Sequence, residues 1–193
     1  MPALNTMRIG QYLRDAQFTP LFVEELGWDR YQTQPLQVAA DGHAYTLRAL
    51  AQKRGMVIYG CAGDDGTLPA YAARRAIEAR VGKTTHEHLI IYTDAALSAQ
   101  VWQWVKREPG RPAACREQAY HRGQSGEALI QRLRGLSVAL EEEEDLTIIE
   151  VVGKVRRSLD VDRVTKRFYE RFKAEHTAFL KVIEGIREQG DRE

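Results

Sequence analysis

Two short apolar runs constrain the fold of this chain more than any other feature. Residues 54–61 and 88–93 are each almost continuously apolar and are bounded by polar or turn-forming residues. Strands that are buried on both faces have this character. Between them, residues 70–81 are rich in Ala and Arg, with Pro69 at the start and Gly82 at the end. Both positions are typical of helix boundaries. The sequence therefore predicts two central strands separated by a helix.

Further strands are predicted around these two. Asp41 and Gly42 separate the alternating segments 36–38 and 44–48, which is a strong signal for a β-hairpin. Residues 99–106 alternate between two faces, and residues 114–120 are predicted as another strand. Helices are expected over residues 7–16, 20–26 and 125–133. We predict an α+β domain with a mixed, mostly antiparallel sheet of about five strands, for which a restriction-endonuclease-like arrangement is one alternative.

The last third of the chain is predicted to be helical. A chain of 193 residues has room for one full domain, which we place at residues 1–140, with a helical extension over residues 141–193. Its second helix, residues 161–186, carries an apolar stripe with three- and four-residue spacing. We expect four residues of this stripe to dock a partner: Val164, Phe168, Phe172 and Phe179. The partner is either another protein or a second copy of the chain.

Charge is grouped in blocks, although the formal net charge is only +1. Residues 103–134 hold seven basic and three acidic residues, residues 141–150 hold six acids, and residues 154–173 hold eight bases and three acids. Clustered cations indicate contact with nucleic-acid phosphates. The candidate DNA-binding residues are Arg74, Arg75, Lys83, Lys106, Arg107, Arg111, Arg116 and Arg122.

Other protein classes are disfavoured. Cys61 and Cys115 lie far apart without metal-ligand spacing, which disfavours a disulfide framework or a zinc finger. No apolar run reaches the length of a signal-peptide core or a membrane span. We expect a cytoplasmic protein that does not interact with membranes.

A metal-dependent nuclease is one candidate activity. Nucleases with a PD-(D/E)-x-K motif place an acid at one strand end and an acid-x-Lys on the neighbouring strand, because the carboxylates hold Mg²⁺. Asp94 and Lys106 have the corresponding strand order, but Trp104 stands where the second carboxylate belongs. Glu24, Glu25 or Glu87 could supply that carboxylate. No cofactor is predicted with certainty, and Mg²⁺ is expected only if the chain is a nuclease.

Two smaller groups of residues are also candidate sites. His86 and His88 point the same way on a strand and could bind a metal together with Asp94, although polar residues at a strand entrance more often satisfy backbone groups. Trp102 and Trp104 share one strand face. They could stack on bases, but large aromatic residues usually belong to the core.

Five segments together carry a family resemblance. They are LFVEELGW at 21–28, KTTHEHLIIYTD at 83–94, VWQWV at 101–105, GQSGE at 123–127 and VTKRFYERF at 164–172. Their order and spacing resemble the N-terminal region of Type IIG-like restriction-modification DNA methylases of the Asn-Pro-Pro-Tyr class. The chain lacks that family's Asn-Pro-Pro-Tyr motif and its glycine-rich S-adenosylmethionine loop, so no methyltransferase activity is expected from it.

The resemblance implies a phage-defence setting with DNA and a methyltransferase region or subunit as partners. The first hypothesis is an accessory domain that contacts the DNA backbone and docks to a methyltransferase through its C-terminal helix. A divergent Mg²⁺-dependent endonuclease domain of the same system is the alternative. A third hypothesis is an oligomerisation module that does not contact DNA.

Overall fold

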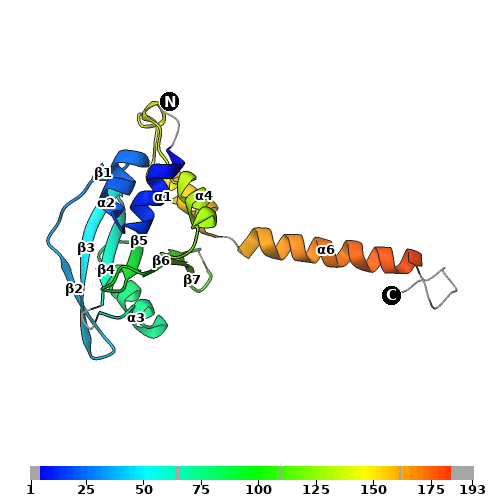
Figure 1. Cartoon of the computed structure of the whole chain (residues 1–193), viewed down its shortest axis with the longest axis horizontal. Coiled ribbons are helices and arrows are strands. Elements are labelled where there is room, and N and C mark those ends of the chain that lie inside the picture. The colour runs from blue at the N-terminus through cyan, green and yellow to red at the C-terminus, as the bar shows by residue number, and fades with distance from the viewer. Residues whose placement is uncertain (1–4, 64–65, 109, 161, 184–193) are drawn as a thin grey trace. The chain divides into compact units, whose positions relative to one another are not determined.

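A seven-stranded sheet organises the chain (Figure 1). The computed structural model describes residues 5–63, 66–108, 110–160 and 162–183, with the backbone alone for residues 162–168 and 180–183. Its strands are β1 (Asp29–Arg30), β2 (Leu36–Ala40), β3 (His43–Lys53), β4 (Met56–Ala62), β5 (His88–Thr93), β6 (Ala99–Lys106) and β7 (Ala114–His121). The sheet order is β1-β3-β4-β5-β6-β7, and β2 also pairs with β3.

The pairing directions confirm the predicted fold class. Strands β4 and β5 pair in parallel, whereas every other described pair is antiparallel. The parallel pair is joined by helix α3 (Tyr71–Val81), because two parallel neighbours need a crossover connection. The chain is therefore an α+β protein with a mixed, mostly antiparallel sheet. The strand count exceeds the predicted five, and the two-residue strand β1 is too short to produce a sequence pattern.

The predicted hairpin is present between β2 and β3. Asp41 and Gly42 form its turn with φ angles of 49° and 79°, and Ala40 pairs with His43 across it. Two positive φ angles define the tight turn whose twist matches that of paired strands, and Asp-Gly adopts it at low cost. The turn chemistry thus fixes the register of this hairpin.

Helices cover both faces of the sheet (Figure 1). On one face α3 packs on a cluster that includes Val57, Tyr59, Ile90 and Tyr92. The other face is covered by α1 (Thr6–Arg14), α2 (Phe18–Pro20), the π-helix η1 (Leu21–Glu25), α4 (Glu127–Arg134) and α5 (Ile148–Leu159). Strand β5 is buried along its whole length because both of its faces are covered. Its continuous apolar sequence follows from this position.

Gly27 ends the first helical region, as predicted, and its conformation explains why no other residue fits. Its φ is +73°, and a Cβ atom there would lie less than 3.0 Å from the carbonyl oxygen of Val138. Next to it, Trp28 donates from Nε1 to the Leu136 carbonyl at 2.9 Å, and Val138 donates to the Leu26 carbonyl at 2.8 Å. These contacts join η1 to the segment after α4.

The chain divides into two compact units, residues 1–159 and residues 160–193. The sequence placed a boundary at residue 140 instead. The difference arises from α5, because Val151 and Val155 are fully buried in the core of the first unit. The intervening acidic loop, with the 3₁₀ helix η2 (Leu140–Glu142), is anchored to β3 through an ion pair of Glu143 with Lys53.

The second unit contains helix α6 (Asp162–Ile183). Over the residues whose side chains are described, it exposes Tyr169, Phe172 and Phe179. Its predicted ends, Val161 and residues 184–186, lie outside the described residues. In the described part of the chain, no helix combines the length and apolar character that a membrane span requires.

Candidate nucleic-acid interface

Several predicted cations meet at one end of the sheet, where β6 ends and β7 begins. The carboxylate of Glu108 lies at their centre, 3.2 Å from Lys106, 3.5 Å from Arg111 and 2.7 Å from Arg156. The hydrogen bond from Lys106 contributes most to lowering the pKa of Glu108, so this carboxylate stays ionised. One negative charge here faces three positive ones, which leaves the cluster positively charged.

A second ion pair continues this cluster toward α3. Arg107 donates from Nη2 to Oε1 of Glu78, which lies on α3. Gly82 lies beside this pair, and a Cβ atom there would lie 2.9 Å from Nη2 of Arg107, so a larger residue would displace the end of that side chain. Lys83 is the next residue, and its side chain is exposed. We call Lys83, Lys106, Arg107, Arg111 and Arg156 the basic end of the sheet.

Behind the basic end lies a buried histidine. His88 forms a 2.7 Å hydrogen bond through Nδ1 with the Thr85 carbonyl, and its Nε2 lies 3.6 Å from Glu78. Burial lowers the pKa of His88 from 6.5 to about 4, so the ring is neutral at pH 7. Burial also raises the pKa of Glu78, although Arg107 acts in the opposite direction. This group supports the fold beneath the exposed cations.

Four of the eight predicted DNA-binding residues are not part of the basic end. Arg74 is only 11% exposed and forms a two-pronged ion pair with Glu117. Arg122 lies at the opposite end of β7, 3.8 Å from Asp15. Arg116 is half-buried on β7 opposite Trp104. The eighth residue, Arg75, is exposed on α3 beside Tyr71. The predicted surface therefore divides into a coherent part and scattered members.

The four predicted catalytic residues do not form one site. Asp94 follows β5 and accepts hydrogen bonds from Ser98 and Ala99, which lower its pKa. Strand β6 runs from Ala99 to Lys106, so Lys106 lies about 23 Å away at the other end of that strand. Antiparallel pairing thus separates the two residues on which the nuclease hypothesis depends.

The remaining two acids do not restore the arrangement. Glu25 is on η1, where it pairs with Arg8 at 3.0 Å. Glu87 precedes β5 at the same end as Lys106, where it contacts His86. Asp94 is again distant from Glu87, because the length of β5 lies between them.

The predicted metal ligands are likewise apart. The Nδ1 atom of His86 faces Glu87 at 2.8 Å, and Nδ1 of His88 is engaged by a backbone carbonyl. Asp94 lies at the opposite end of β5. Over the described ranges, no group of three His, Cys, Asp or Glu side chains is arranged to hold a metal ion.

The two tryptophans of β6 belong to the core, as the simpler interpretation held. Trp102 and Trp104 are 1% and 2% exposed, and Trp102 packs edge-on against Phe18 at 5.6 Å between ring centroids. Neither ring is available to stack on a base. Contact with nucleic acid at this site would therefore involve charge rather than aromatic stacking.

For the predicted docking stripe, the side chains of Phe172 and Phe179 are described, and they are 58% and 63% exposed. The side chains of Val164 and Phe168 lie outside what is described. The structure adds Tyr169, which is 66% exposed on the same helix.

The sequence missed the residues that organise the site. Glu108 was counted only as an acid within a basic block, although its place between Lys106 and Arg111 is a local signal for ion pairing. Arg156 lies in the basic block 154–173, but nothing in the sequence connects it with Glu108, 48 positions earlier. Glu78 is buried on α3 and gave no signal.

Comparisons with protein-family models, curated proteins and solved structures found no match for the chain.

Proposed function

We propose that this chain is an accessory domain of a DNA restriction-modification system that binds the DNA backbone without cleaving it. The observation that carries the proposal is the convergence of Lys106, Arg111 and Arg156 on Glu108. A single carboxylate holds these side chains in place without neutralising them. Arranged cations of this kind attract phosphates independently of base sequence.

The exposed members of the basic end suit this role. Arg111 is 76% exposed and Arg156 is 40% exposed, so each can contact a phosphate while Lys106 keeps Glu108 paired. Lys83 adds an exposed ammonium group beside Gly82. The separation of Asp94 from Lys106 supports binding without cleavage.

Salt dependence of DNA binding tests this proposal. We expect the triple variant Lys83→Ala, Arg111→Ala and Arg156→Ala to bind a labelled duplex more weakly. It should also lower the slope of log K against log salt concentration by about 0.9 for each phosphate contact that is lost. Fluorescence anisotropy between 50 and 200 mM salt, about the range where such binding changes most, provides both quantities.

A matched triple variant controls for net charge. Arg14, Arg30 and Arg48 are exposed cations that lie outside the basic end. Replacing these three by Ala removes the same charge and should leave the slope near that of the unchanged chain. Equal slopes for the two triple variants would contradict the proposed interface. Supercoiled plasmid incubated with the chain and Mg²⁺ should remain uncut.

We further propose that α6 docks to the methyltransferase that the family resemblance implies. The support is the exposure of Tyr169 and Phe179 on a 22-residue amphipathic helix. Large exposed aromatic residues mark protein interaction surfaces. Phe179→Asp should abolish co-elution with a purified methyltransferase of the Asn-Pro-Pro-Tyr class, whereas Thr177→Asp is the control on the same helix. Co-elution that survives Phe179→Asp would contradict this role.

A further inference from the structure

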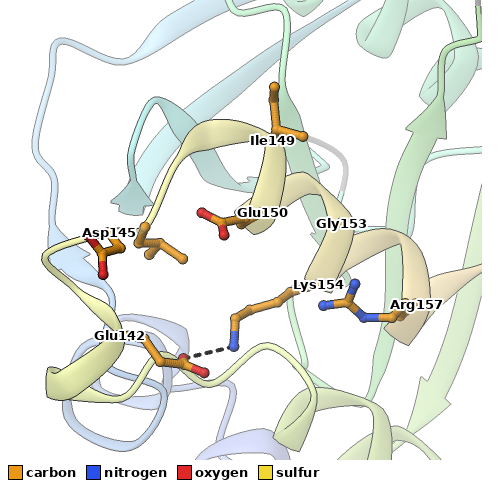
Figure 2. A pocket seen from close by; sticks show the side chains of 8 residues that line it. Glu142, Asp145, Ile149, Glu150, Gly153, Lys154 and Arg157 are labelled. Carbon is orange, nitrogen blue, oxygen red and sulfur yellow. Dashed lines mark hydrogen bonds and ion pairs between the residues drawn. The ribbon is translucent and has the colours of Figure 1, made fainter.

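A groove on the outer side of α5 lies outside the basic end. Figure 2 shows its lining, with Ile149, Gly153 and Arg157 following one another along α5 at four-residue intervals. Leu146 adds to its apolar part, and the acidic loop contributes Asp145 and Glu142. Ile149 is 80% exposed, which is unusual for a β-branched apolar side chain on a well-packed helix.

Gly153 is the second unusual feature of the groove. A glycine within a helix costs about 1 kcal/mol relative to alanine. No steric reason for it exists in the described structure, because a Cβ atom there would meet only Arg157 Nη1 at 3.6 Å. The missing side chain leaves a depression beside Ile149 in which an apolar side chain fits.

Charge is distributed unevenly along the groove. Glu142 binds Lys154 at 2.9 Å, and Glu150 accepts a hydrogen bond from the Thr147 amide at 2.7 Å, so both are used within the fold. Asp145 and Arg157 have no side-chain partner among the described residues. Figure 2 places Asp145 at one end of the groove and Arg157 at the other. An occupant therefore needs a cation for the first end and a carboxylate for the second.

The turn of α6 around Phe172 carries this combination. Phe172 is 58% exposed, and at 100° per residue Arg171 and Lys173 flank it on either side. Glu175 follows one turn later. Along α6 the cations Arg171 and Lys173 come before Glu175. Along the groove Asp145 comes before Arg157. If the two helices run parallel, each charge therefore faces one of opposite sign.

We propose that the α5 groove of one copy of this chain binds the Phe172 turn of α6 from a second copy, with Phe172 over Gly153 and against Ile149. Two such contacts related by a twofold axis form a closed dimer. The contact uses one turn of a 22-residue helix and leaves Phe179 for another partner. The proposal goes beyond DNA binding and does not depend on it.

The mass of the full chain in solution provides the first test. We expect light scattering to give twice the 22.0 kDa of one chain at micromolar concentration. Gly153→Leu should shift the protein to a monomer, because its side chain fills the depression. This variant should still fold, since leucine favours helix and the position is open. Ala79→Leu, at an exposed position on α3, is the control and should remain dimeric.

Charge reversal provides the second test. The variant Asp145→Lys should be monomeric, and so should the variant with Arg171→Glu and Lys173→Glu. Mixing the two should restore both contacts between unlike chains, one with reversed charges and one with the original charges, and mass measurement detects the product as a heterodimer.

Each other result overturns the proposal. A wild-type chain that stays monomeric at all accessible concentrations excludes the dimer. A dimer that persists in Gly153→Leu means that the groove is not the receptor, as in direct pairing of two α6 helices. Failure of the reversed variants to associate when mixed removes the assigned charge pairing.

Discussion

Arg74 on α3 and Glu117 on β7 form a two-pronged ion pair, in which Nε and Nη2 of Arg74 donate to the two carboxylate oxygens at 3.0 and 2.7 Å. The pair joins the helix to the last strand of the sheet. Gln103 donates to the same carboxylate at 2.9 Å and accepts a hydrogen bond from the Tyr92 hydroxyl at 3.0 Å. We therefore expect Arg74 to act as a structural residue rather than as a DNA ligand.

Replacing Arg74 by Ala should lower the free energy of unfolding by about 2 kcal/mol, because Glu117 and the pocket around it lose a charged hydrogen-bond partner. The neighbouring variant Arg75→Ala removes the same charge from an exposed position. It should change stability by less than about 0.5 kcal/mol. Urea unfolding of both variants checks the contrast, and equal effects would count against a structural role for Arg74.

Gly27 and Gly42 allow the cost of a steric clash to be separated from the cost of a left-handed backbone conformation. Both have positive φ angles, +73° and +79°, but only Gly27 would bring a Cβ atom against the Val138 carbonyl. Gly42→Ala should cost about 1 kcal/mol, the usual penalty for a left-handed alanine. Gly27→Ala should cost at least about 2 kcal/mol more, or prevent folding, because the chain must also shift. Thermal unfolding distinguishes the two, and similar losses would show that the segment near Val138 yields easily.

Two substitutions of Lys53 distinguish the packing of its aliphatic stem from the contribution of its charge. Its ammonium group is buried and contacts Asp29 at 3.1 Å as well as Glu143, whereas both acids are partly exposed. Lys53→Met should therefore change the free energy of unfolding by less than about 1 kcal/mol, because the freed acids regain water. Lys53→Ala should cost about 2 kcal/mol or more, since it leaves a cavity where the stem packed. A larger loss for methionine than for alanine would contradict this argument.

Stability should depend on pH through His88. Its pKa is about 4 when folded and 6.5 in its ordinary state, so the unfolded chain binds the proton more readily. The stability contributed by neutral His88 is complete above pH 6.5 and is lost as the pH falls toward 4, by up to about 3 kcal/mol. The raised pKa of Glu78 acts in the opposite direction at the acidic end. Arg107 and His86 both lower the pKa of His88 through their charge.

The free energy of unfolding should fall as the pH is lowered from 7 to 5, a window of about two units that lies above the folded-state pKa of His88. The fall should be smaller for His88→Gln than for the unchanged chain. His43→Gln changes an exposed histidine and should leave the pH dependence as it was. Identical pH profiles for all three proteins would exclude His88 as the source.

The fold was predictable where the signal was local. Asp41 and Gly42 define their own turn, and the sequences of β4 and β5 show that neither face meets water. The ion pairs were not predictable, because Arg74 and Glu117 are 43 positions apart and meet only through the sheet order. The same limit applies to Asp94 and Lys106. Their order along the chain fits a nuclease, but the hairpin between β5 and β6 sends them to opposite ends.

The parallel pairing of β4 with β5 has a consequence for the order of folding. Strands β2 to β4 form one set of adjacent hairpins, and β5 to β7 form another, so each set can assemble from contacts that are short in sequence. The two sets share a sheet only after the chain between Ala62 and His88 closes on itself. Closing that loop costs chain entropy before any pairing rewards it. Folding speed should therefore respond more to substitutions at the β4–β5 seam than to equally destabilising ones within either hairpin set.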